Sequence, residues 1–215
     1  MNSSENGWQT LDKFVEIRSP WLTLIGEHLQ DNRGRILEYW RVEKADSAVI
    51  LTLQNGNLIL PPPTYRPGLG QATLDFAGGR VPPGQTPETA VPTILQRELG
   101  VETSAICHLT PLNTIGWAVN SSFSNQKLYG FVAELHPTAA IPAGCTGATY
   151  PATGAGVRAL LDHLPAMSGG AAGMAPATGR AHSLSAPAPR LHPPTGSNCK
   201  FFYRGVGRHP PPLLE

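Results

Sequence analysis

The residues best placed to do chemistry lie in the stretch TYRPGLGQATLDFAGGRVPPGQTPETAVPTILQRELGV, at positions 64–101. It reads as a strand, a glycine-rich turn and a short helix. Gly78 and Gly79 allow the backbone to approach a ligand closely, and Thr86-Pro87 is a favourable N-cap and first helical position. A helix that begins there directs free N–H groups toward an anion. The stretch therefore predicts a loop-helix site for a diphosphate and a metal ion.

Acidic side chains are few on the predicted helix. Glu98 is the clearest candidate for a metal ligand, and Glu102 shares its helix face only if the helix continues past Gly100, a typical helix end. Two carboxylates four residues apart can hold a hard cation, Mg²⁺ or Mn²⁺, through oxygen. A lone glutamate more often pairs with a neighbour such as Arg97. Pro92 lies inside the helix, so we expect the start of the helix to be kinked or delayed.

The same stretch resembles a Nudix box. That pattern is a glycine, five residues, Glu, seven residues, Arg-Glu, an aliphatic residue, one residue, Glu-Glu, one residue, a glycine and an aliphatic residue. Read from Gly79 without a gap, the sequence matches it at Leu95, Glu98, Gly100 and Val101. The segment TYRPGLGQATLDFAGG is similar to the lead into the box in the ADP-ribose pyrophosphatase branch of the Nudix hydrolases. The resemblance covers residues 20–164.

This resemblance implies an α+β fold, a Nudix-like α/β/α sandwich with a mixed β-sheet. It also implies cleavage of the diphosphate in nucleoside diphosphate derivatives such as ADP-ribose, with Mg²⁺ as the metal. Arg66 would contact the phosphate or the base, Gly79 would bring the backbone to the diphosphate, and Glu98 would bind the metal and act in catalysis. Members of this branch commonly dimerise through their N-terminal strands, which makes residues 20–45 the candidate homodimer interface.

The box departs from the family pattern at most of its acidic positions. Gln85 and Ile94 stand where the family has glutamate, Thr93 where it has arginine, and Arg97 where it has the first glutamate of the pair. Ile94 offers no metal ligand, and Arg97 would repel a cation. Shifting the frame by four residues places Arg97-Glu98-Leu99 on the Arg-Glu-aliphatic element but loses both glycines of the box. In a later loop, where the branch often has an acidic residue, this sequence has Asn125-Gln126.

Two hypotheses follow from this mismatch. In the first, the protein is a divergent Nudix diphosphatase that recruits metal ligands from elsewhere. In the second, it is a catalytically impaired Nudix-fold module that binds a nucleotide ligand or a protein partner. The candidate replacement ligands are the carboxylates Asp75, Glu88, Glu102 and Glu134.

Alternating apolar patterns and turn signals predict the elements that position this stretch. WLTLIGEHL and RILEYWRVE flank a turn at residues 31–34, and SAVILTL and NLILP flank Asn55-Gly56, so we expect two hairpins. SAICHLTPLN, IGWAV and LYGFVAEL read as further strands. Thr153 can cap a helix over GAGVRALLDHL. Residues 1–20 form an N-terminal arm in which LDKFVEIRSP packs as an arm or a turn of helix, and residues 21–164 form the domain.

Composition limits the other functions. Sixteen Lys plus Arg against fifteen Asp plus Glu leave a net charge of +1, which favours neither nucleic acid nor a membrane as partner. Residues 165–215 are rich in Pro, Gly, Ala and Ser, so they predict a disordered tail or, as a second hypothesis, a frameshifted translation. Three cysteines without CxxC spacing and the lack of a signal-peptide pattern favour a soluble, cytoplasmic protein. We expect Trp21, Trp40 and Trp117 to be core or dimer-face aromatics.

Overall fold

The computed structural model describes residues 7–164, so the predicted tail and the frameshift hypothesis lie outside the described residues. The strands are β1 (Gln9–Arg18), β2 (Thr23–Gln30), β3 (Ile36–Glu43), β4 (Ser47–Gln54), β5 (Asn57–Leu60), β6 (Thr64–Arg66), β7 (Gln71–Thr73), β8 (Ala77–Arg80), β9 (Ile106–Pro111), β10 (Trp117–Ala118), β11 (Lys127–Leu135) and β12 (Ala148–Pro151). The helices are α1 (Pro87–Leu99) and α2 (Gly154–His163), with a 3₁₀ turn, η1 (Thr103–Ala105).

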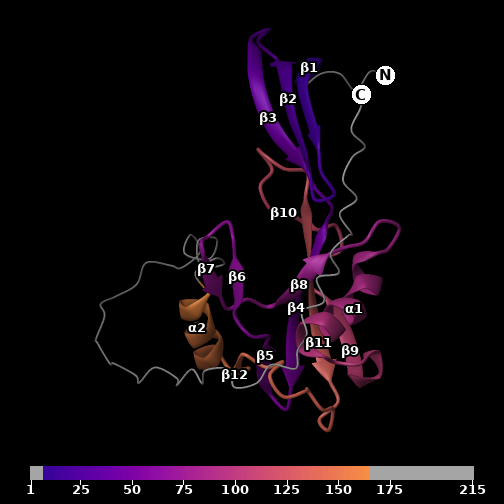
Figure 1. The fold of residues 1–215 in the computed structure, drawn as a ribbon, viewed down its shortest axis with the longest axis vertical. Coiled ribbons are helices and arrows are strands. Elements are labelled where there is room, and N and C mark those ends of the chain that lie inside the picture. Colours follow the sequence, from indigo (N-terminus) through magenta and orange to yellow (C-terminus); the bar gives the residue numbers. More distant parts are fainter. Residues whose placement is uncertain (1–6, 165–215) are drawn as a thin grey trace, which may run out of the picture.

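The central sheet is mixed and lies between the two α-helices. Its order is β10-β11-β4-β5-β12, with β8 also paired to β4 and β9 to β11, and β4 and β11 run parallel while the other pairs are antiparallel. Side chains alternate across a strand, so Ile50 of β4 packs into the core on the α1 side while Leu51 and Leu53 pack with Leu160 of α2. Figure 1 shows the helices on opposite sides of the sheet. The predicted α+β fold with a mixed sheet is confirmed.

Local turn chemistry accounts for the two predicted hairpins. Asn55 and Gly56 both have positive φ, 50° and 72°, as a tight turn between twisted antiparallel strands requires, and they join β4 to β5. Gly34 (φ 77°) lies in the turn between β2 and β3. Thr153 caps α2 by accepting a hydrogen bond from the backbone N–H of Gly156 at 3.2 Å. Both hairpins and the second helix are confirmed.

Helix α1 begins directly after Thr86, so the prediction that Pro92 delays its start was wrong. The Thr86 hydroxyl accepts from the backbone N–H of Thr89, and the Thr89 hydroxyl accepts from that of Thr86, at 3.2 and 3.0 Å. Proline in a helix interior costs about 3 kcal/mol. The burial of five apolar side chains offsets this cost, at about 1.5–3 kcal/mol for a fully buried large side chain. These residues are Ala90, Val91, Ile94, Leu95 and Leu99. Gly100 then ends the helix in the left-handed conformation, φ 66°.

The first three strands form a separate sheet, with β2 between β1 and β3 (Figure 1). Residues 9–18 pair with β2 along their length, so the turn of helix predicted as one option for LDKFVEIRSP was wrong. Nine of the ten β1 residues are exposed, Phe14 and Ile17 among them, and only one is of intermediate burial. Trp21, Trp40 and Trp117 are all exposed, so the core alternative predicted for them was wrong, and their place on a dimer face stays a prediction.

Hydrogen bonds join this N-terminal sheet to the central sheet. The backbone N–H of Val42 donates to the carbonyl of Phe123 at 2.8 Å, and that of Lys44 donates to Asn125 Oδ1 at 2.9 Å. From the other side, Arg80 Nη1 of β8 donates to the carbonyl of Pro20 at 2.9 Å. Three distant chain segments therefore meet where β3 leads into β4. Within residues 7–164, no helix is both long and apolar enough to cross a membrane.

Candidate functional site

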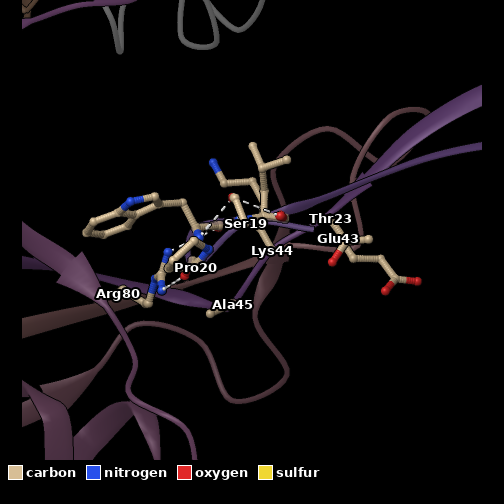
Figure 2. Close-up of a pocket in the computed structure, with 9 residues that line it drawn as sticks. Ser19, Pro20, Thr23, Glu43, Lys44, Ala45 and Arg80 are labelled. Carbon is tan, nitrogen blue, oxygen red and sulfur yellow. Dashed lines mark hydrogen bonds between the residues drawn. The ribbon is translucent and has the colours of Figure 1, made fainter. Parts of the chain in front are cut away.

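A cleft of about 490 Å³ opens where the N-terminal sheet meets the central sheet. It is lined by Trp21, Leu22, Lys44, Ala45, Ser47, Arg66, Arg80 and Gln126. A smaller pocket of about 230 Å³ adjoins it and shares five of these residues, with Arg80 beside Pro20 on one wall and Lys44 and Glu43 near it (Figure 2). The lining comes from the β1–β2 turn, the β3–β4 link, β4, β6, β8 and the loop before β11, so no single segment of sequence defines it.

The cleft is basic. It has three cationic side chains on its walls, Lys44, Arg66 and Arg80, and among the described residues no Asp or Glu lines it. Arg66 is paired with Asp75, whose Oδ2 lies 2.7 Å from Arg66 Nη2 and also accepts from Thr73. No carboxylate in the described part of the chain pairs with Lys44 or Arg80. Only one of the three cations, Arg66, is therefore neutralised by a carboxylate. The remaining positive charge favours the binding of a doubly charged anion.

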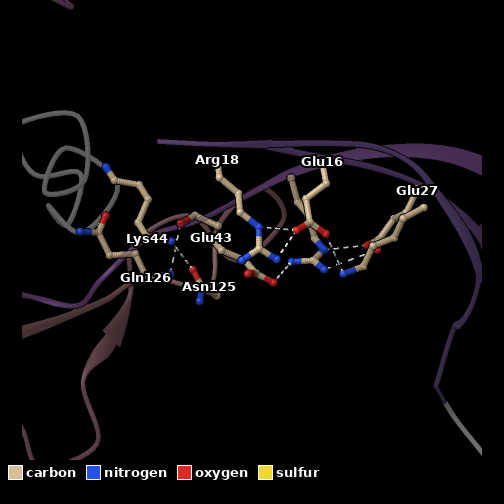
Figure 3. Close-up of polar contacts among 10 residues, drawn as sticks. Glu16, Arg18, Glu27, Glu43, Lys44, Asn125 and Gln126 are labelled. Carbon is tan, nitrogen blue, oxygen red and sulfur yellow. Dashed lines mark hydrogen bonds and ion pairs between the residues drawn. The ribbon is translucent and has the colours of Figure 1, made fainter. Parts of the chain in front are cut away.

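Glu43 does not neutralise Lys44, because a neighbouring arginine holds its carboxylate. Arg41 Nη1 contacts Glu43 Oε1 at 2.7 Å, and its Nε contacts Glu27 Oε1 at 2.7 Å (Figure 3). The hydrogen bonds that Arg41 donates to Glu27, and then to Glu43, raise the pKa of Arg41 above its ordinary value, so this guanidinium stays charged. Arg18 likewise pairs with Glu16. The acids at the base of the N-terminal sheet are therefore paired with arginines, and none of them lines the cleft.

Arg80 is fixed in place by the β1–β2 turn. Its Nη1 and Nη2 donate to the carbonyls of Pro20 and Trp21 at 2.9 and 3.1 Å, and its guanidinium lies 4.8 Å from the centre of the Trp21 ring. These contacts hold the charge without cancelling it. The Trp21 side chain is 64% exposed at the cleft, so an apolar ring face adjoins the cations. A ligand that carries both an aromatic ring and phosphates matches this pairing.

The loop before β11 completes the cleft with one amide side chain, Gln126. Gln126 Nε2 donates to the carbonyl of Ala45 and to Ser47 Oγ at 3.1 and 2.7 Å, which fixes the Gln126 side chain beside Lys44. This is the loop where the family resemblance led us to look for an acidic residue. It reaches the cleft with the neutral amide of Gln126 instead, so it adds a hydrogen-bonding group and leaves the positive charge intact.

The loop-helix segment has a different arrangement from the predicted metal site. Arg97 Nε and Nη2 contact Glu98 Oε1 at 2.8 and 2.7 Å, and Nη2 also donates to the carbonyl of Gly78 at 2.9 Å. A Cβ atom at Gly79 would lie only 2.5 Å from Nη2, so the guanidinium occupies the space beside that glycine. Helix α1 ends at Leu99, and Glu102 accepts from Gln96 Nε2 at 3.2 Å outside the helix. Glu98 and Glu102 do not share a helix face.

The residues around Glu98 do not fit a divalent metal ion. Across residues 7–164, no group of three or more His, Cys, Asp or Glu side chains is arranged to hold a metal. Of the predicted replacements, Asp75 is paired with Arg66, and Glu134 is exposed on β11. Mg²⁺ takes six oxygen ligands, of which the protein usually supplies one or two as carboxylates that are free to bind it. One carboxylate already paired with an arginine is a poor donor set.

Arg66 is the one predicted site residue that lines the cleft, and Gly79, Glu98 and Glu102 are not among its lining residues. Sequence reasoning missed Lys44 and Arg80. Arg80 directly follows Gly79 in the chain, but its neighbours in sequence do not reveal that the β1–β2 turn folds against it. One signal was available in the sequence. Only 14% of the residues are charged, so two arginines in one stretch, Arg66 and Arg80, indicate a candidate anion site.

Comparisons with known proteins bear on the fold. No protein-family model and no curated protein matches this sequence. Among solved structures, one described as "Crystal structure of ADP compounds hydrolase" matches with a TM-score of 0.58 and 23% sequence identity, covering 75% of this chain and 86% of that one. At this identity the likeness concerns the fold alone.

Proposed function

We propose that this protein binds a nucleoside diphosphate derivative such as ADP-ribose in the basic cleft, as a Nudix-fold module. The observation that carries the proposal is that Lys44, Arg66 and Arg80 line one cleft. Of these three cations only Arg66 is paired with a carboxylate, that of Asp75. Charge-assisted hydrogen bonds from such groups are the strong ones in phosphate recognition. Trp21 supplies the ring face for the base, and Gln126 and Ser47 supply neutral hydrogen-bonding groups for the sugar.

Calorimetric titration with ADP-ribose, ADP and AMP tests this function. We expect ADP-ribose and ADP to bind at least about tenfold more tightly than AMP, because a second phosphate adds at least one charge-assisted contact worth about 1.5–3 kcal/mol. Lys44→Gln and Arg66→Gln should each weaken ADP-ribose binding about tenfold or more. Arg158→Gln is the matched control, because it removes the same charge from an exposed position on α2. Equal weakening by the control, or no binding of any of the three ligands, would contradict the proposal.

Hydrolysis of the same ligand is the second candidate function. The likeness of fold to a protein described as an ADP compounds hydrolase favours it, and Glu98 with Mg²⁺ is the predicted centre. Incubation of ADP-ribose with the purified protein, with and without Mg²⁺ and beside Glu98→Gln, separates the two candidates. AMP and ribose phosphate released only by the intact, metal-loaded protein establish the enzyme, whereas binding without turnover establishes the module.

The homodimer through the N-terminal strands stays a prediction, and the exposed apolar side chains of β1–β3 support it. Ile17 and Ile36 are 59% and 62% exposed on strands that form a sheet of their own. Exposed apolar clusters of this kind are typical of protein interfaces. We expect light scattering after size exclusion to give twice the mass of one chain, and Ile17→Asp/Ile36→Asp to give the mass of one. Ile115→Asp, at an exposed position outside these strands, should remain dimeric. A wild-type monomer would refute the dimer.

A further inference from the structure

We infer that the Arg97 guanidinium is a built-in cation that takes the place of a divalent metal ion in the loop-helix site. The inference starts from two oxygens, the backbone carbonyl of Gly78 and Oε1 of Glu98. Both are ligands of the kind that a hard cation takes, and both accept from Arg97 Nη2, at 2.9 and 2.7 Å. The positive charge that would otherwise come from a metal is therefore supplied by the chain itself.

The fit of the guanidinium against β8 shows that this is more than a pair between neighbours on a helix surface. Gly78 lies 19 residues before Arg97, and the bond between them fixes the side chain across the gap between β8 and α1. Gly79 has no side chain in the space that Nη2 occupies, where a Cβ would come within 2.5 Å. The glycine that the family pattern uses for a ligand thus accommodates the arginine here.

Two consequences follow. A divalent ion brought to Glu98 would meet the charge of Arg97 at contact distance and would find the two oxygens taken. Conversely, exchanging Arg97 for a carboxylate frees the Gly78 carbonyl and Glu98 and adds a third oxygen ligand, so it creates a cation site in the same place.

Titration of the full chain with Mn²⁺, followed by electron paramagnetic resonance, tests the inference without any nucleotide. We expect no binding by the wild type in the millimolar range, and one site in Arg97→Glu that is at least tenfold tighter. Glu98→Gln added to Arg97→Glu should abolish this gain. Arg158→Glu, which changes the net charge equally on α2, should show no gain. Arg97→Gln, which removes the charge without adding a carboxylate, should bind Mn²⁺ more tightly than the wild type.

Binding of one Mn²⁺ by the wild type that Glu98→Gln removes would overturn the inference, and so would a folded Arg97→Glu variant with no gain. If Arg97→Glu does not fold, the wild type and Arg97→Gln decide. If calorimetry detects no binding of ADP-ribose, the proposed function fails while the Mn²⁺ titration still decides this inference.

Discussion

Replacing Ile94 with glutamate, the residue that the Nudix pattern has at this position, is expected to destabilise the fold by about 4 kcal/mol or more. Ile94 is 2% exposed and packs in the core between α1 and the central sheet, with Ile50, Ala77 and Phe131 in the same cluster. The change removes a buried apolar side chain and places a carboxylate among apolar neighbours. The free energy of unfolding of a typical domain is about 5–15 kcal/mol, so this loss is a large part of the total stability.

Urea denaturation followed by circular dichroism measures this effect. Thr93→Glu is the matched control, because residue 93 is exposed on the same helix and its substitution should change stability by less than about 0.5 kcal/mol. If Ile94→Glu unfolds at the wild-type urea concentration, α1 does not bury this face and its placement against β8 is wrong. The expected result means that a glutamate at position 94 cannot contribute to a metal site, because the side chain at this position lies in the core.

Arg41→Ala is expected to destabilise the protein by about 3 kcal/mol and to weaken nucleotide binding. Arg41 pairs with Glu27, whose side chain is only 4% exposed, and removal of the guanidinium leaves that carboxylate buried without its partner. The same change releases Glu43, which lines the smaller pocket together with Lys44. The freed carboxylate reduces the positive charge available to an anion.

Thermal unfolding and ADP-ribose titration follow the two effects separately. Arg41→Ala/Glu27→Gln should recover part of the stability, because it removes the buried charge, but should not recover affinity, because Glu43 remains free. Arg18→Ala removes an exposed arginine from the same sheet and should leave Tm nearly unchanged, since its ion pair with Glu16 is exposed. Recovery of affinity in the double variant would show that Glu43 does not affect the cleft.

The elements that local chemistry specifies were predictable. Asn55-Gly56 needs positive φ at both positions, Thr86 and Thr153 satisfy free N–H groups at helix starts, and Gly100 accepts the left-handed conformation at a helix end. Each of these depends on neighbours a few residues away. β1 was not predicted because its apolar and charged residues lie on a strand that is exposed almost throughout, so burial leaves no one-sided pattern in the sequence. The effect of Pro92 was misjudged because packing of the apolar face outweighed a local penalty.

The candidate sites divide in the same way. Sequence by itself determined the loop-helix segment and the lack of acids in it, since those depend on residue types and short spacings. It left open whether Glu98 binds a metal ion or pairs with a neighbour such as Arg97. Tertiary structure decided that Lys44, Arg66 and Arg80 meet in one cleft, that Arg41 pairs with Glu27, and that Arg97 reaches the carbonyl of Gly78. These contacts join segments separated by up to dozens of residues. Their energies come from charges brought within a few ångströms by the packing of strands and helices, which no local pattern encodes.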